Sequence, residues 1–353
     1  MHHLGAAKRV TLQDIAKRTG YSLTAVSRAL RNMSDISPEA TSYIQKTAME
    51  MGYVANQTAI ALRYGRTNII TVIIVNLTNP FFSIITNLIQ LAAHEMGYSL
   101  FIVCSRNDQS LEQQLIKQAI ARRSDGVLLF PSCGSSKSIE MLQAAHIPFV
   151  LLSCTFPPYQ TDSVIIDDEQ GSYLAGRHLI EAGCRKVAFL STSNSAPSYL
   201  PRSKGFLRAC DEANITLDKR CLYTFSCEKI DSENKDQTSL TSLLPKLKQD
   251  SVDGLFVFCD IEAWHIMAAL QQSSQLHIND FKIVSFDNID SALVSPIPLC
   301  SVDCGLEYMA RSSIELLRSR IQGDNRPPQT IVCPVSLVCR NSCNSTPKHL
   351  PEN

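Results

Sequence analysis

The 353-residue sequence predicts an α/β protein in which a small N-terminal helical head precedes a larger body built on parallel sheets. Three observations lead to this fold class. Two short helical patterns flank a tight turn between residues 10 and 30, a β-branched run begins at Ile69, and strands then alternate with helices. The length suits two or three domains.

The head begins with two short helices. Thr11 is placed to cap the first helix, with Asp14 as the acid of a capping box, and Gly20 is placed to end it. Ser22 is placed to cap the second helix. Its outward positions are Leu23, Thr24, Ser27 and Arg28. Short polar groups and an arginine near a helix N-terminus suit reading of the DNA major groove, although an ordinary helical hairpin has the same pattern.

A third helix and a linker complete the N-terminal region. Ser37, Pro38 and Glu39 form a strong helix start, and Gly52 is placed to stop this helix. Residues 56–65 have helical propensity, but so short a helix is marginal in water. We therefore expect this segment to be helical only when a partner supports it.

Charge is distributed unevenly along the chain, although its formal net charge is zero. Residues 1–66 contain nine Lys or Arg against four acidic residues, whereas the remainder contains 24 against 29. The head is therefore basic and the body acidic. A basic head fits a polyanionic partner, and a chance fluctuation of surface charge is the alternative.

From Ile69 onward the pattern predicts two doubly wound lobes. The apolar run IITVIIV is typical of a strand buried on both faces. Further strands are expected at residues 99–104, 126–130, 149–153, 187–191, 254–259 and 282–287. Helices are expected up to residue 96, over 110–123, 169–182 and 202–213, and from Ala263. Strands that alternate with helices pair in parallel.

Composition argues against several classes of protein. No apolar run is long enough to span a membrane, and the first ten residues lack a secretory signal, so we expect a cytoplasmic protein. We interpret the 13 scattered cysteines as buried apolar side chains in a reducing compartment. Cys300 and Cys304 lie four residues apart with no histidine near them, and Cys339 and Cys343 repeat that spacing. No metal or cofactor is predicted, because no metal pattern includes His94, His146, His178 or His265.

The order of head, hinge segment and two-lobed body resembles the lac-repressor (LacI/GalR) family of bacterial transcription regulators. The family's opening signature is matched by Val10-Thr11-Leu12, Asp14-Ile15-Ala16, Gly20, Ser22 and residues 26–30. The signature around its third helix is matched by Ile36-Ser37 and residues 51–56. Body motifs at family spacing include Asn79-Pro80-Phe81-Phe82, Asp125-Gly126-Val127, Gly205-Phe206, Asp253-Gly254 and Phe286-Asp287.

The resemblance implies a domain organisation and a function. We expect a helix-turn-helix head at 1–55, a hinge helix and linker at 56–67, a periplasmic-binding-protein-like core at 68–343, and a disordered tail at 344–353. The first lobe would contain 68–167 and 304–330, and the second 168–303 and 331–343. Such a protein is expected to be a homodimeric repressor of a near-palindromic operator in double-stranded DNA. A small-molecule effector, a sugar or sugar derivative, would bind between the lobes and control operator affinity.

The expected DNA contacts lie on the second helix and in the hinge. Leu23, Thr24 and Arg28 are the base-reading candidates, and Ser22 and Ser27 are candidates for phosphate. The hinge match implies Leu62 as an apolar wedge in the minor groove, with Ala59 close to the groove wall. Packing within the head is the alternative for Leu23, and contact with the body is the alternative for Leu62. The expected set is completed by Thr11 and Asn56.

For the effector, the resemblance points to Phe81, Phe82, Arg202 and Asp287, with Asp260 as a further candidate. An aromatic ring can stack on a sugar, while the carboxylate and guanidinium can bind paired hydroxyls. Phe81 could instead belong to the lobe core, and Asp260 could instead cap the helix expected from Ala263.

Two departures from the family pattern concern the hinge and the effector. Ala55 replaces the usual proline before the hinge, and Cys259-Asp260 stands where many members have Asn-Asp. A transcriptional activator of the same family and a cytosolic sensor without operator binding are the alternative functions. An enzyme is not expected, because no G-x-S-x-G, Walker or strand-following G-x-G-x-x-G motif occurs.

Overall fold

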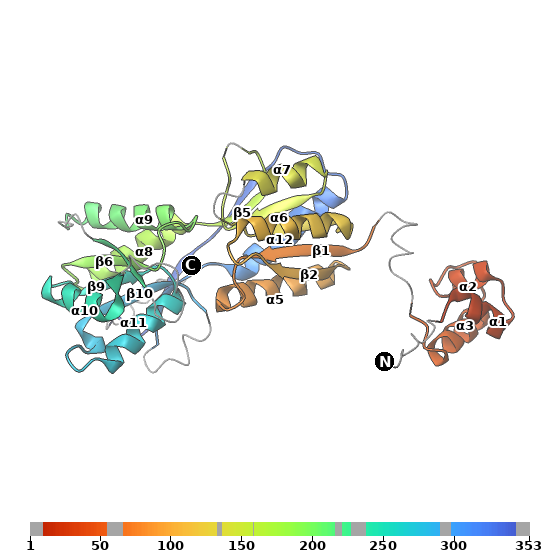
Figure 1. Cartoon of the computed structure of the whole chain (residues 1–353), viewed down its shortest axis with the longest axis horizontal. Helices are drawn as coiled ribbons and strands as arrows, with labels where there is room; N and C mark the ends of the chain where they lie inside the picture. Colours follow the sequence, from red (N-terminus) through yellow and green to blue (C-terminus); the bar gives the residue numbers. More distant parts are fainter. Residues whose placement is uncertain are drawn as a thin grey trace, which may run out of the picture. The chain divides into compact units, whose positions relative to one another are not determined.

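The structure, a computed structural model, describes residues 10–54, 66–132, 136–157, 159–215, 221–226, 238–289 and 298–343. The chain divides into two compact units, Met1–Thr67 and Asn68–Asn353, which we call the head and the body (Figure 1). Among the described residues, no helix is long and apolar enough to cross a membrane. The predicted tail at 344–353 and most of the predicted hinge, with Ala55, Asn56, Ala59 and Leu62, lie outside the described residues.

Within residues 10–54, the head contains three helices, each preceded by a capping side chain: α1 (Leu12–Thr19), α2 (Leu23–Ala29) and α3 (Pro38–Glu50). Thr11 and Asp14 form a capping box at the start of α1. Gly20 ends this helix with φ 77°, a left-handed backbone conformation that glycine adopts readily. Ser22 and Ser37 each accept a backbone N–H at the start of their helix. The apolar sides of the helices meet in a small core of Ile15, Val26, Ala29, Ile44 and Ala48.

The first lobe of the body is one parallel sheet covered by helices on both faces. Its strands are β1 (Ile69–Ile74), β2 (Ser99–Cys104), β3 (Gly126–Leu129), β4 (Phe149–Leu152), β5 (Ser163–Ile166) and β12 (Thr330–Cys333). Its helices are α5 (Pro80–Glu95), α6 (Gln109–Ala121), α7 (Ser136–Ala144) and α12 (Leu306–Ile321). The order is β12-β5-β4-β3-β1-β2. Because side chains alternate along a strand, Val72 and Ile74 pack with α5 and α12, whereas Ile73 packs with α6 and α7.

The second lobe repeats this arrangement (Figure 1). Its strands are β6 (Val187–Ser191), β7 (Leu222–Ser226), β8 (Thr238–Ser239), β9 (Gly254–Val257), β10 (Lys282–Asp287), β11 (Cys300–Asp303) and β13 (Ser336–Val338). Its helices are α8 (Asp168–Glu181), α9 (Tyr199–Glu212), α10 (Leu240–Gln249), α11 (Asp260–Gln272) and the short η1 (Ile278–Asp280). The order is β13-β11-β10-β9-β6-β7-β8, and β13 pairs antiparallel with β11. Phe256 packs with α8 and α9, whereas its neighbours Leu255 and Val257 pack with α10 and α11.

The chain passes between the lobes three times. The passages follow β5, β11 and β12, because β12 pairs with β5 in the first sheet while β13 pairs with β11 in the second. The first lobe therefore keeps β12 as far as Cys333, three residues beyond the boundary expected at residue 330. These passages bring the carboxyl ends of both sets of parallel strands into one part of the body.

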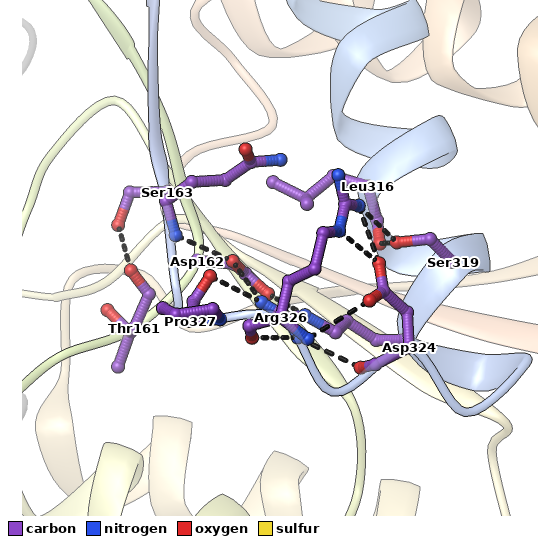
Figure 2. A network of polar contacts seen from close by, with 10 residues as sticks. Thr161, Asp162, Ser163, Leu316, Ser319, Asp324, Arg326 and Pro327 are labelled. Atoms are coloured by element: carbon purple, nitrogen blue, oxygen red, sulfur yellow. Dashed lines mark hydrogen bonds and ion pairs between the residues drawn. The ribbon is translucent and has the colours of Figure 1, made fainter.

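A polar network fixes the loop between α12 and β12 (Figure 2). Arg320 is bound to both carboxylate oxygens of Asp162, at 2.5 and 3.0 Å, and its Nη1 donates to the carbonyls of Asp324 and Arg326. Asp324 in turn accepts from Arg326 Nε at 2.6 Å. Because the Arg320 and Asp162 side chains are only 13% and 6% exposed, this pair is protected from solvent and ties α12 to the start of β5. Asp162 also accepts the N–H of Gln329, the residue before β12, at 3.0 Å.

Candidate DNA-binding and ligand-binding sites

In the head, the first turn of α2 presents side chains to solvent. Leu23 is 52% exposed, so it is not a core residue, and Thr24 beside it is also exposed. Ser22 accepts the N–H of Ala25 at 3.1 Å, which holds its side chain at the helix N-terminus. An exposed apolar side chain and two hydroxyl groups on one turn can contact base edges and phosphate.

Arg28 is 40% exposed at the head surface, but its guanidinium already has an acidic partner there. Its Nε and Nη2 bind the two carboxylate oxygens of Asp35 at 3.0 and 2.6 Å, a bidentate pair at the head surface. The backbone carbonyl of Ser27 accepts from Arg31 Nε at 2.9 Å. Thr11 is occupied too, because its hydroxyl donates to Asp14 at 2.7 Å as part of the capping box. Contact of Arg28 with a base would therefore require Asp35 to exchange its partner.

The body contains a cavity of about 790 Å³ between the two lobes, within the size range of small-molecule sites. Most of its lining residues follow the carboxyl ends of parallel strands, where open α/β sheets bind ligands. Those from the first lobe include Asn76, Asn79, Phe81, Phe82, Arg106, Asn107, Phe130 and Ser153. Those from the second lobe include Asp168, Ser193, Ser195, Ser198, Arg202, Phe258, Cys259 and Asp287.

An aromatic cluster forms the wall on the first-lobe side. Phe81 and Phe82, from the start of α5, lie edge to face with ring centroids 5.2 Å apart, and Phe130 contacts Phe82 at 5.3 Å in the same way. Phe81 is only 6% exposed and belongs to the lobe core, as its alternative interpretation expected, while its effector contact stays a prediction. Phe130, which follows β3, was not predicted, because a single aromatic residue at a strand end carries no signal by itself.

A buried arginine organises the second-lobe side. Arg202 is 4% exposed, and its guanidinium carbon lies 4.5 and 3.7 Å from the ring centroids of Phe258 and Phe286. Its Nε donates to Asp168 at 2.7 Å, its Nη1 donates to the carbonyl of Phe258, and its Nη2 lies 3.7 Å from Asp287. Asp168 was missed from the sequence, although it lies two residues after the end of β5 and is the first residue of α8.

Electrostatics and backbone geometry single out Asp287. Burial raises the pKa of Asp168 and raises that of Asp287 well above its usual range, while the Arg202 guanidinium acts in the opposite direction. Asp287 also has φ 107°, which a residue with a Cβ rarely adopts. The cavity-lining Ser153, Arg106 and Asn107 have positive φ values as well. Such strain is concentrated at functional sites.

Asp260 does not line this cavity, in contrast to the prediction. Helix α11 begins at Asp260, three residues earlier than expected, so this residue does not cap a helix from Ala263 either. Its carboxylate is fully buried and accepts from the hydroxyls of Ser285 and Ser301 and from the N–H of Ile289. Asp260 therefore ties α11 to the ends of β10 and β11, beside the cavity.

A second cluster lies in the second lobe near the amino end of β11, whereas the cavity lies at the carboxyl ends of the strands. His178 of α8 and three cysteines, Cys300, Cys339 and Cys343, bring their nitrogen and sulfur atoms within 4.8 Å of one another. This is the group among the described residues that could hold a metal ion. No sequence pattern connects these residues, because His178 lies more than 100 residues from each cysteine.

A helical head whose second helix exposes its first turn, joined to a two-lobed body with a polar and aromatic interlobe cavity, is typical of DNA-binding proteins that carry a ligand-binding domain. The family description "Bacterial regulatory proteins, lacI family" matches residues 11–56, and "Periplasmic binding protein-like domain" matches residues 177–343. The chain is 27% identical over 339 residues to the HTH-type transcriptional regulator DegA of Bacillus subtilis (strain 168), covering 95% of this chain and 98% of DegA. It is 25% identical over 333 residues to the HTH-type transcriptional repressor PurR of Mannheimia succiniciproducens, covering 94% and 98%.

Solved structures agree with this fold. The lac repressor dimer bound to operator and the anti-inducer ONPF has a TM-score of 0.82 at 22% identity, covering 95% of this chain and 99% of that chain. A periplasmic binding protein/LacI transcriptional regulator from Alkaliphilus metalliredigens QYMF, complexed with D-xylulofuranose, has a TM-score of 0.68 at 24% identity and covers 78% and 98%. Residues 11–56 thus match the lacI-family DNA-binding domain and residues 177–343 a periplasmic-binding-protein-like domain, and the relatives that match along most of the chain are transcriptional regulators. The predicted family and fold class are thus confirmed.

Proposed function

We propose that this regulator is a cytoplasmic, homodimeric repressor of a near-palindromic operator, and that a sugar or sugar derivative in the interlobe cavity controls its operator affinity. The cavity carries this proposal, because its lining combines an aromatic wall with a buried Asp–Arg–Asp cluster and its volume suits a small molecule. Repression is supported by the relative PurR, a repressor by name, and by the lac repressor structure, which is a dimer on its operator.

The chemistry of the cavity favours a ligand rich in hydroxyl groups. A carboxylate accepts several hydrogen bonds, so Asp168 and Asp287 can each receive a ligand hydroxyl while they hold Arg202 in place. The faces of Phe82 and Phe130 offer apolar contact to the C–H groups of a sugar ring. A ligand that contacts both lobes would favour one angle between them, which is how it could act at a distance. The D-xylulofuranose complex of a related fold agrees with this ligand class.

On the DNA side, we propose that Leu23 and Thr24 read bases and that Ser22 and Ser27 contact phosphate. Arg28 joins them by exchanging Asp35 for a guanine edge or a phosphate. Two heads are required, because one head reads only a half-site. Leu62, Ala59 and Asn56 of the hinge remain proposed DNA contacts on the strength of the family resemblance.

The test is selection of bound sequences from a random duplex library by the purified full-length protein at a stated salt concentration. A near-palindrome with a central pyrimidine–purine step is the expected product, since the hinge wedge requires a step that kinks easily. The selected duplex then serves as the probe for a panel of monosaccharides and sugar phosphates, scored by release of DNA. Sequence-blind, salt-sensitive binding throughout would contradict the proposal and favour a sensor without an operator. A ligand that tightens DNA binding would support the proposed cavity site, but it would raise operator affinity instead of lowering it.

A further inference from the structure

The histidine–cysteine cluster of the second lobe joins three separate segments of the chain. His178 lies in the last turn of α8, Cys300 is the first residue of β11, and Cys339 and Cys343 follow β13. Cys343 Sγ lies 3.0 Å from His178 Nε2, 3.0 Å from Cys300 Sγ and 3.8 Å from Cys339 Sγ. All four donor atoms lie within 4.8 Å of one another.

These separations suit one small tetrahedral ion. With Zn–S bonds of about 2.3 Å, two sulfur ligands of a tetrahedral zinc are about 3.8 Å apart, within the range seen in this cluster. Three cysteines and one histidine are a donor set of structural zinc sites, and two of the ligands have the short Cys-x3-Cys spacing typical of them. Thiolate and imidazole ligands also disfavour magnesium and calcium, which prefer oxygen.

The surroundings of the cluster agree with a closed structural site. Cys300 and Cys343 are fully buried, and the half-buried His178 and Cys339 leave a route for an ion to enter. The N–H of Arg340 donates to Cys300 Sγ at 3.0 Å, the kind of bond that stabilises a metal thiolate. The Arg340 side chain points elsewhere, donating to the carbonyl of Leu299 at 2.7 Å and to Asn288 Oδ1 at 2.6 Å.

We propose that His178, Cys300, Cys339 and Cys343 bind one Zn²⁺ ion, which fastens the segment after β13 to α8 and β11. With four protein ligands the ion has no open position, so its role is structural. The fastened segment carries Arg340, whose partner Asn288 directly follows the cavity residue Asp287. The site thereby supports one wall of the cavity, although it does not depend on what the cavity binds.

A disulfide between Cys300 and Cys343 is the competing outcome for these thiols. Their sulfur atoms lie 3.0 Å apart, beyond the bonded distance of about 2.05 Å. A disulfide would remove two of the three thiolate ligands, so the protein cannot form both structures at once. The two outcomes are therefore separable by metal content and thiol count on the same sample.

The experiment uses the untagged full-length protein, reduced, stripped with a chelator and titrated with Zn²⁺ against a chromophoric competitor. We expect one Zn²⁺ per chain, a higher unfolding temperature on loading, and thiolate charge-transfer and tetrahedral d–d absorption when Co²⁺ replaces Zn²⁺. Cys339→Ala should weaken binding by at least about 100-fold, beyond the usual loss on mutation of an outer-shell residue, and should reduce the charge-transfer band. His178→Gln should weaken binding but retain that band.

Cys210→Ala is the matched control, because Cys210 is a buried cysteine of the same lobe outside the cluster. It should bind Zn²⁺ as the unmodified chain does. The proposal fails if the reduced protein binds no stoichiometric Zn²⁺, or if a Cys300–Cys343 disulfide persists after reduction. It fails equally if Cys339→Ala and His178→Gln retain full affinity, because binding would then lie elsewhere, for example at His2 and His3.

Discussion

Arg202 supplies the buried positive charge that balances two carboxylates of the cavity wall. The guanidinium of Arg202 is held between Phe258 and Phe286 and compensates the carboxylates of Asp168 and Asp287, which are each about 5% exposed. We expect Arg202→Met to lower the free energy of unfolding of the body by about 3 kcal/mol, because it leaves buried carboxylates without a counter-charge. Urea unfolding measures this loss. Mild acidification should recover part of it, since protonation removes the uncompensated charge.

Lys204→Met is the control for this prediction. Lys204 lies on the same helix and pairs with Glu169, but the Lys204 side chain is 69% exposed. An exposed pair of this kind contributes little, so its loss should be within about 0.5 kcal/mol. Equal stability of Arg202→Met and the unmodified protein would show that Arg202 is not the counter-charge of this cluster.

Glu262, also buried beside this cluster, makes stability depend on pH. Burial raises the pKa of Glu262 from 4.5 to about 7, and the Thr192 hydroxyl at 2.5 Å acts in the opposite direction. The folded protein thus holds a proton that the unfolded chain has lost, so this residue's favourable contribution is complete below pH 4.5 and is lost as pH rises to 7. Glu262→Gln, which mimics the protonated acid, should gain up to about 3 kcal/mol over the unmodified protein across that interval.

Unfolding curves of both proteins over this pH range measure the effect. Glu315→Gln, at an exposed position of α12, should show no comparable change. A stability difference for Glu262→Gln that does not vary with pH would mean that Glu262 is ionised in the folded protein throughout.

Among the helices and strands, the sequence predicted those features that depend on a few neighbouring residues. The caps at Thr11, Ser22 and Ser37 and the apolar run of β1 are each encoded within a few neighbouring residues, and they appear as expected. The start of α11 was predicted three residues too late, because Asp260 resembles a residue that caps a helix. In the structure its carboxylate instead accepts from Ser285 and Ser301. Contacts that depend on packing, such as those of Asp168, Phe130 and the His178 cluster, have no local signature.

The second helix of the head carries a prediction of its own. Leu23→Ala should lower affinity for the selected operator by about tenfold, because it removes one base contact, and should leave head stability unchanged, since Leu23 is 52% exposed. Fluorescence anisotropy with the selected and a scrambled duplex separates the specific from the sequence-independent part. Met49→Ala, at an 82% exposed position of α3, is the control and should change neither. Loss of affinity for both duplexes alike would assign Leu23 a role other than base reading.

For the whole molecule, the proposed function predicts energetic coupling between the interlobe cavity and the operator. If a cavity ligand lowers operator affinity by a given factor, operator must lower ligand affinity by the same factor, and factors of about 5–150 are usual. We therefore expect the ligand found by the sugar panel to bind more weakly by calorimetry when saturating operator is present, and to bind unchanged when scrambled duplex replaces it. A ligand that contacts both lobes would transmit this effect by changing their relative angle, because the cavity is lined by strand ends of both. Equal affinity of the cavity for the ligand with and without operator, despite release of DNA by that ligand, would contradict coupling through the cavity, because release would then come from ligand bound at another site.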